Sequence, residues 1–122
     1  MFINEENLIF VYDAQISANL REIIESGNLT FSKKLRILGA VLDAMSYLSF
    51  HNILTRQICL DNIVLANNKP KLFDFSNAIH NENHKLQVTK IIPGFISAEI
   101  LKEKNYNYKS DVFIFGVIMY CV

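Results

Sequence analysis

Residues 51–78 hold the pattern that most constrains the fold of this chain. Two apolar runs, Ile63-Val-Leu65 and Lys71-Leu-Phe73, flank Ala-Asn-Asn-Lys-Pro, whose turn-forming residues predict a short β-hairpin. This hairpin would place Asn62 at one end and Asp74 at the other. An amide oxygen and a carboxylate so positioned suit a hard cation such as Mg²⁺, which takes oxygen ligands.

Helical spacing predicts most of the remaining framework. From Phe31 to Phe50 apolar residues recur with helical period after Thr30, which predicts a long helix with Thr30 as its N-cap. The residues at this spacing are Leu35, Leu38, Leu42, Met45 and Ser49, reinforced by Val41 and Leu48. Other helices are expected over 20–25, capped by Asn19 and stopped at Gly27, over 97–104, and from Ser110, as the cap, to the C-terminus.

The other segments read as strands and connections. Residues 1–4 and 8–12 predict a hairpin around the polar tip 5–7, and Ile53-Leu54 predicts a short strand. Residues 13–18 are expected to form a connector, and residues 76–93, which show little periodicity, a loop.

Composition excludes several classes of protein. The 122 residues allow one domain, and 51% hydrophobic and 20% charged residues with a formal net charge of zero indicate a globular protein. The chain has no excess of basic residues that would favour binding to nucleic acid or to an anionic membrane. The apolar run 112–122 is shorter than the roughly 20 residues of a membrane span. Cys59 and Cys121 show neither metal-site nor disulfide spacing and are interpreted as packing residues, and no signal peptide is evident, so a cytoplasmic location is expected.

The segment with Asn62 and Asp74 resembles the catalytic loop and metal-binding segment of the protein kinases. That family has His-Arg-Asp, an Asn five residues after the Asp, and then Asp-Phe-Gly. The corresponding positions here are Thr55-Arg56-Gln57, Asn62 and Asp74-Phe75-Ser76. The resemblance therefore implies that the metal ligands are kept while the catalytic base is replaced by Gln57.

The resemblance extends in order along the whole chain. Residues 7–12 resemble the last strand of the kinase small lobe, and Asp13 to Gln15 resemble the hinge whose backbone meets adenine. Residues 93–99 resemble the end of the activation segment, and residues 110–116 the start of the central large-lobe helix. The implied fold is α+β and kinase-like: one partial domain over 1–122, with the last small-lobe hairpin and the hinge in 1–15 and a mostly helical large-lobe fragment in 16–122. The family's Gly-rich loop and phosphate-gripping lysine would lie upstream of these residues.

The resemblance also implies a role for each site residue. Asn62 and Asp74 would hold Mg²⁺ between the phosphates of ATP, although Asn62 could instead satisfy loop backbone groups and Asp74 cap a turn. Gln57 cannot act as a base near neutral pH, and Cys59 replaces a lysine that steadies the transferred phosphate. Arg56 would pair with a phosphorylated Thr89 or, as the preferred interpretation, with any nearby acid.

Four further residues carry smaller expectations. Asp111 would hydrogen-bond the backbone of the catalytic loop, or simply favour a helix start, and Phe75 would pack in the core. His80 and His84 have the spacing of two metal ligands on a helix, but their polar neighbours favour a loop and no third ligand is evident.

Three functions remain open on sequence alone. The first is a pseudokinase fragment that binds or scaffolds a protein partner, with lost or very weak phosphotransfer. The second is a kinase transferring the γ-phosphate of ATP to protein Ser, Thr or Tyr, with missing parts supplied by sequence outside this chain. The third is a truncated product without function of its own, which would self-associate through its C-terminal helix, where five apolar residues would have lost much of their covering: Phe113, Phe115, Ile118, Met119 and Val122.

Overall fold

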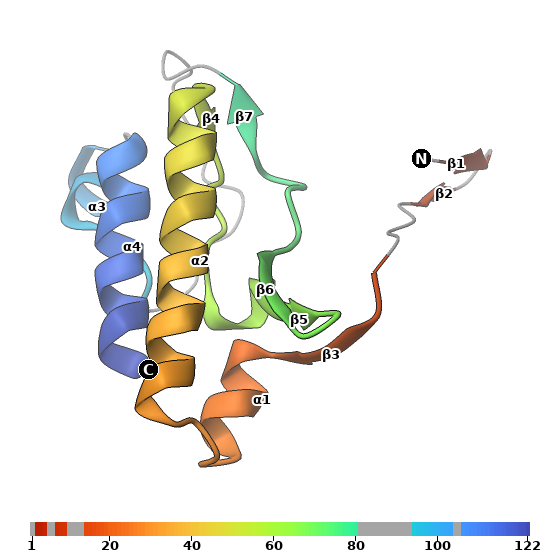
Figure 1. Ribbon diagram of the computed structural model, residues 1–122. Helices are drawn as coiled ribbons and strands as arrows, with labels where there is room; N and C mark the ends of the chain where they lie inside the picture. Colours follow the sequence, from red (N-terminus) through yellow and green to blue (C-terminus); the bar gives the residue numbers. More distant parts are fainter. Residues whose placement is uncertain (1, 5–6, 10–13, 81–93, 104–105) are drawn as a thin grey trace.

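The computed structural model describes residues 2–4, 7–9, 14–80, 94–103 and 106–122. Its elements, in order, are β1 (Phe2–Asn4), β2 (Asn7–Ile9), β3 (Ile16–Asn19), α1 (Leu20–Glu25), α2 (Phe31–Phe50), β4 (Ile53–Leu54), the 3₁₀ turn η1 (Leu60–Asn62), β5 (Ile63–Ala66), β6 (Lys69–Leu72), β7 (Ile79–His80), α3 (Ala98–Glu103) and α4 (Tyr108–Cys121). Helix α2 runs alongside α4 on one side and contacts β6 on the other, as Figure 1 shows. The predicted α+β class is confirmed.

Helix α2 has the predicted bounds, and Thr30 caps it by accepting a hydrogen bond from the backbone N–H of Lys33. The buried residues of α2 are Ile37, Val41 and Met45, which follow one another at intervals of four. Leu35 and Leu42, which belong to the predicted apolar stripe, are 54% and 51% exposed. The prediction was therefore wrong for these two residues, which lie on a side of the helix that is exposed to solvent.

Strand β3 replaces the second half of the predicted connector, residues 16–18. It pairs antiparallel with β5, Asn19 opposite Val64, in the sheet order β3-β5-β6. The Ile-Ser-Ala-Asn sequence has little β-propensity of its own, so pairing with the edge of β5 decides its conformation. Helix α1 then follows as predicted, with a capping box between Asn19 and Glu22, and Gly27 adopts a positive φ of 69° at its end.

The β5–β6 hairpin is confirmed. Ala66 pairs with Lys69, so Asn67 and Asn68 form a two-residue turn with φ of 51° and 60°. Two positive φ values are the requirement of a type I′ turn, and asparagine tolerates them better than most residues. This turn fixes the register that brings the two ends of the hairpin together.

Helix α4 begins earlier than predicted. Its N-cap is Asn107, whose side chain accepts a hydrogen bond from the N–H of Lys109. Ser110 is not the cap but the third residue of the helix, where it forms a capping box with Asn107. Phe115 and Ile118 are buried, with exposed fractions of 9% and 0%, so for these two the expectation of lost covering was wrong. They join a core to which α1, α2, β4, η1, β5, α3 and α4 all contribute.

Two short pairings lie outside this core sheet. β1 and β2 form the predicted N-terminal hairpin, and β7 pairs with β4 within the segment expected to be a loop. His80 is in β7, and the described residues contain no group of three potential metal ligands; His84 and the rest of the predicted loop, 81–93, lie outside the described residues. Among the helices described here, none has the length and hydropathy needed to cross a bilayer.

Candidate functional site

The loop after β4 is organised around Gln57, whose side chain is only 8% exposed. Its Nε2 donates a hydrogen bond to Oδ2 of Asp74 at 3.1 Å, and its Oε1 accepts one from Nδ2 of Asn77. Its backbone carbonyl accepts a third from Nδ2 of Asn62 at 2.9 Å. In the residue at the predicted base position, both the NH₂ group and the oxygen of the side-chain amide are therefore hydrogen-bonded.

Asn62 and Asp74 do lie together, as the hairpin predicted. The backbone N–H of Phe73 donates to the carbonyl of Asn62 at 2.8 Å, which closes the open end of the hairpin. Oδ1 of Asp74 accepts from the N–H of Ser76 at 3.1 Å and from its hydroxyl at 2.6 Å. Asn62 thus satisfies a loop carbonyl and Asp74 caps a turn, which are the structural alternatives to metal binding.

The residues at this site do not fit Mg²⁺ as they are arranged. Asp74 already accepts three hydrogen bonds, one of them from an N–H of Gln57. The hollow that Gln57, Asn62 and Asp74 share measures about 10 Å³, about the room of one water molecule. Mg²⁺ requires near-ideal octahedral geometry and usually keeps several waters. One carboxylate that already accepts three hydrogen bonds and one amide oxygen, in so small a space, do not provide that shell.

Two site residues adopt the left-handed backbone region. Arg56 has a φ of 57° and Asp74 a φ of 60°. Each such residue costs about 1–2 kcal/mol relative to the right-handed region, so surrounding contacts must hold it. Arg56 is held by the hydrogen bond from its Nε to the carbonyl of Asn77 at 2.7 Å, and within the described ranges no acid forms an ion pair with it. Its other predicted partner, Thr89, lies outside the described residues.

The two cysteines differ in their surroundings. Cys59 is 3% exposed, and burial raises the pKa of its thiol, so it is uncharged near neutral pH. A neutral thiol cannot supply the positive charge of the lysine that it replaces. Cys121 is exposed, so its interpretation as a packing residue was wrong.

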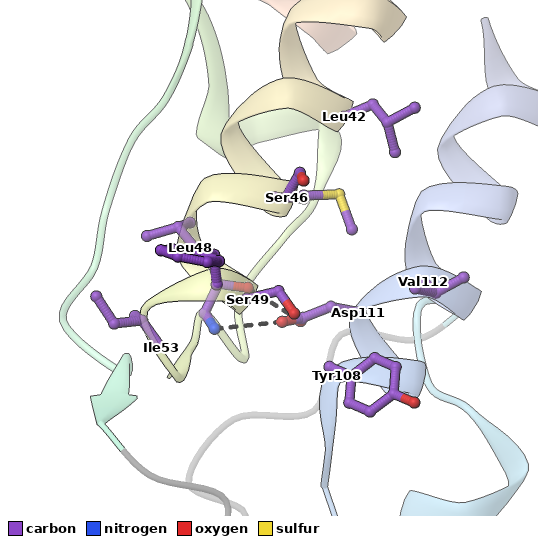
Figure 2. Close-up of a pocket in the computed structure, with 11 residues that line it drawn as sticks. Leu42, Ser46, Leu48, Ser49, Ile53, Tyr108, Asp111 and Val112 are labelled. Atoms are coloured by element: carbon purple, nitrogen blue, oxygen red, sulfur yellow. Dashed lines mark hydrogen bonds between the residues drawn. The ribbon is translucent and has the colours of Figure 1, made fainter.

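Asp111 anchors the loop to the start of α4. It accepts hydrogen bonds from the backbone N–H of Thr55 at 3.3 Å, from the hydroxyl of Thr55 at 3.0 Å, and from the hydroxyl of Tyr106. The dashed lines that reach Asp111 in Figure 2 mark hydrogen bonds to this carboxylate. Burial raises the pKa of Asp111, although these hydrogen bonds oppose the shift, and burial with the nearby carboxylate raises the pKa of Tyr106 well above its ordinary value. The predicted contact with the loop backbone is confirmed.

A second anchor joins η1 to α1. Nε and Nη2 of Arg21 donate to the two carboxylate oxygens of Asp61 at 2.8 and 2.9 Å. This paired geometry lowers the pKa of Asp61. Both side chains are nearly half exposed, so the pair positions η1 more than it stabilises the fold.

The sequence also predicted that Asp13 and Gln15 lie at an adenine-binding hinge and that Phe75 lies in the core. Asp13 lies outside the described residues, and the carbonyl of Gln15 accepts a hydrogen bond from the N–H of Asn67 at 3.1 Å, so that acceptor is engaged by the hairpin turn. Phe75 is 41% exposed, so its expected place in the core was wrong.

Sequence reasoning missed three residues that hold the site together. Asn77 and Tyr106 are the partners of Gln57 and Asp111, and Arg21 is the partner of Asp61. Asn77 and Tyr106 lie close in sequence to Asp74 and Asp111, which was the available signal. Arg21 lies 40 residues from its partner, and nothing local pointed to it.

Known proteins resemble this chain along its length. The family described as "Protein kinase domain" matches residues 1–122. Serine/threonine-protein kinase max-2 of Caenorhabditis elegans is 29% identical over 95% of the chain and 18% of its own length. Protein kinase C-like 1 of the same organism is 31% identical over 98% and 18%, and human calcium/calmodulin-dependent protein kinase type 1B is 30% identical over 80% and 30%.

The chain thus spans less than a third of each of these three relatives. Kinase domains in general use ATP and Mg²⁺. The match over the whole chain, together with the hairpin that brings Asn62 and Asp74 to one loop and the Asp111 anchor, shows that this chain belongs to the protein kinase domain family.

Proposed function

We propose that this chain acts as a pseudokinase segment, which binds or scaffolds a protein partner and transfers phosphate very weakly or not at all. The observation that carries the proposal is Gln57, an amide in the place of the catalytic carboxylate, hydrogen-bonded at both ends. A general base contributes about 10²- to 10⁴-fold to rate. The neutral thiol of Cys59 removes a further charge from the phosphate site.

Phosphotransfer provides the direct test. Purified chain is incubated with radiolabelled ATP, Mg²⁺ and a general acceptor protein, and incorporation is compared with that of the Gln57→Ala variant. We expect both to remain at background. Labelling by the wild-type chain that disappears in the variant would overturn the proposal.

Nucleotide binding provides a second test. Thermal unfolding is followed during an ATP titration with and without Mg²⁺, beside the Asp74→Ala variant. We expect no saturable shift in the unfolding midpoint, because the Asp74 carboxylate is engaged by Gln57 and Ser76. A saturable, Mg²⁺-dependent shift that Asp74→Ala abolishes would show a working nucleotide site.

The runner-up function is an active kinase completed by sequence outside these residues or by another chain. Two features favour it. Asn62 donates through Nδ2, which leaves its oxygen end to meet a cation, and Asp111 holds the loop as the family resemblance implied. Relatives named serine/threonine-protein kinases also favour it. It requires that the bond from Gln57 to Asp74 open, which is the event that the nucleotide titration would detect.

We further propose that the chain associates with a second copy of itself across α2 and α4. A pocket of about 390 Å³ lies between these helices. Apolar residues such as Leu42 on α2 and Val112 on α4, both labelled in Figure 2, line it together with the polar residues Ser46, Ser49, Thr55 and Asp111. Val112, Phe113 and Met119 on α4 are about half exposed. Because the formal net charge is zero, no overall repulsion opposes contact between identical chains.

Sedimentation tests this association. We expect the wild-type chain to form dimers or larger species and the Val112→Lys variant to shift toward monomer, because a charge would be placed in the contact. The exposed Lys109→Ala change on the same helix serves as the control. A wild-type monomer with a sharp cooperative melt would contradict the proposal.

The same chain is proposed to reside in the cytoplasm. In the described part of the chain both cysteines are free thiols, Cys59 buried and Cys121 exposed. An exposed free thiol is compatible with a reducing compartment and prone to oxidation elsewhere. Fractionation of cells expressing the tagged protein would test the location; recovery in the secreted medium would contradict it.

A further inference from the structure

Gln57 connects three parts of the chain, through its side-chain amide and through its backbone carbonyl. Gln57 lies after β4, Asn62 ends η1, and Asp74 and Asn77 follow β6. All three partners bond to this one residue, and Gln57 is 8% exposed. The side-chain amide of Gln57 therefore bonds Asp74 and Asn77, and its backbone carbonyl bonds Asn62.

Only an amide satisfies both side-chain contacts. Nε2 donates to the carboxylate of Asp74, while Oε1 accepts from the amide of Asn77. A carboxylate in the same place could accept from Asn77, but it has no donor for Asp74. It would instead place two negative charges about one hydrogen-bond length apart, an arrangement that raises the free energy of the folded state unless a proton or a cation intervenes.

The amide also compensates for the position of Asp74. This residue is half-buried with a φ of 60°, and Oδ2 of its carboxylate lies against the amide of Gln57. It accepts three hydrogen bonds from the chain, one from Gln57 and two from Ser76. These contacts hold the carboxylate in place.

We propose that Gln57 is a built-in substitute for a cation: its amide crosslinks Asp74 to the loop, so that the site keeps its shape without Mg²⁺. This role extends beyond the proposed function and does not depend on it, because it concerns metal alone and no nucleotide. Gln57 is then the one residue that makes the site a poor fit for Mg²⁺.

The test uses the Gln57→Glu variant, which exchanges one NH₂ group for an oxygen and keeps the length of the side chain. Thermal unfolding of the variant and the wild type is recorded in millimolar MgCl₂ and in KCl of matched ionic strength. In KCl we expect the variant to unfold about 4–12 °C below the wild type. Mg²⁺ should recover much of that loss in the variant and leave the wild type unchanged.

A second variant separates charge repulsion from general damage. Adding Asp74→Asn to Gln57→Glu reverses donor and acceptor, because the new amide can donate to the new carboxylate and its oxygen can still accept from Ser76. We expect this double variant to be more stable than Gln57→Glu alone and to show no response to Mg²⁺. The matched control is Asn28→Asp, the same amide-to-acid change at an exposed residue between α1 and α2.

Each outcome decides the proposal. A Mg²⁺-specific rise in the unfolding midpoint of the wild type would overturn it, and so would a Gln57→Glu variant as stable as Asn28→Asp. If Gln57→Glu does not fold in either salt, recovery of folding by the added Asp74→Asn change supports the crosslink, and failure to recover refutes it. The phosphotransfer and ATP experiments can fail without changing these results.

Discussion

Replacement of Asp111 by alanine should destabilise this chain more than any change at its surface. The carboxylate accepts from the N–H of Thr55, from the hydroxyl of Thr55 and from the hydroxyl of Tyr106. The exposed fractions of Asp111, Thr55 and Tyr106 are 7%, 6% and 5%. Each buried donor left without an acceptor costs about 1–3 kcal/mol.

Two effects make the loss of stability smaller than the summed cost of three unpaired donors. The hydroxyls of Thr55 and Tyr106 can rotate toward water that enters the vacated space, whereas the N–H of Thr55 cannot. Removing Asp111 also removes the cost of burying a carboxylate, the largest cause of its raised pKa. We therefore expect a loss at the lower end, about 3–5 kcal/mol of the free energy of unfolding. A chain of this size has about 6–18 kcal/mol in total.

Urea and thermal unfolding measure the loss. At about 3–5 °C for each kcal/mol, the midpoint of Asp111→Ala should fall by about 10–20 °C. Asp43→Ala, the same change at an exposed position of α2, is the matched control. If the two variants unfold within about 0.5 kcal/mol of each other, the anchor contributes no more than a surface residue and the reasoning is refuted.

Three further predictions follow from burial and charge. Burial raises the pKa of Asp111, so the folded chain binds the proton of this carboxyl more tightly than the unfolded chain does. The contribution of Asp111 to stability should therefore fall as pH rises from about 4 through the raised pKa. In urea titrations at several pH values, the Asp111→Asn variant should lack that fall. Arg21→Ala should cost at most about 1 kcal/mol in urea unfolding, and since Arg21 lowers the pKa of Asp61, that contribution is present above the ordinary carboxyl pKa and is lost as pH falls or salt rises. Ile118→Ala, at a position with 0% exposure, should cost about 2–5 kcal/mol by the same measurement, and a loss under 1 kcal/mol would contradict the assigned core.

Local chemistry made several elements readable from the sequence. Thr30 marked the start of α2 and the apolar period its extent, and Asn19 and Gly27 marked the two ends of α1, because caps and left-handed stops depend on neighbouring residues only. The Asn-Asn turn likewise predicted the β5–β6 hairpin, and with it the meeting of Asn62 and Asp74.

The errors arose where distant segments decide the outcome. Strand β3 exists because β5 offers it a partner, and the buried edge of α2 is set by α4 and β6. The contacts of Gln57 could not be read from the sequence either. Its replacement of a carboxylate suggested only a loss, whereas its two amide ends meet Asp74 and Asn77, 17 and 20 residues away.

The side chain at position 57 cannot serve as a base and also hold this site closed without a metal. A carboxylate there has the acceptor that a base requires, but next to Asp74 it needs a cation to offset the repulsion. The amide of Gln57 supplies its own donor and so removes both the base and the need for the cation. In the role proposed for Gln57, the same exchange of carboxylate for amide accounts for both the loss of the base and the independence from metal, and the uncharged thiol of Cys59 is compatible with a site that does not balance the charge of a phosphate.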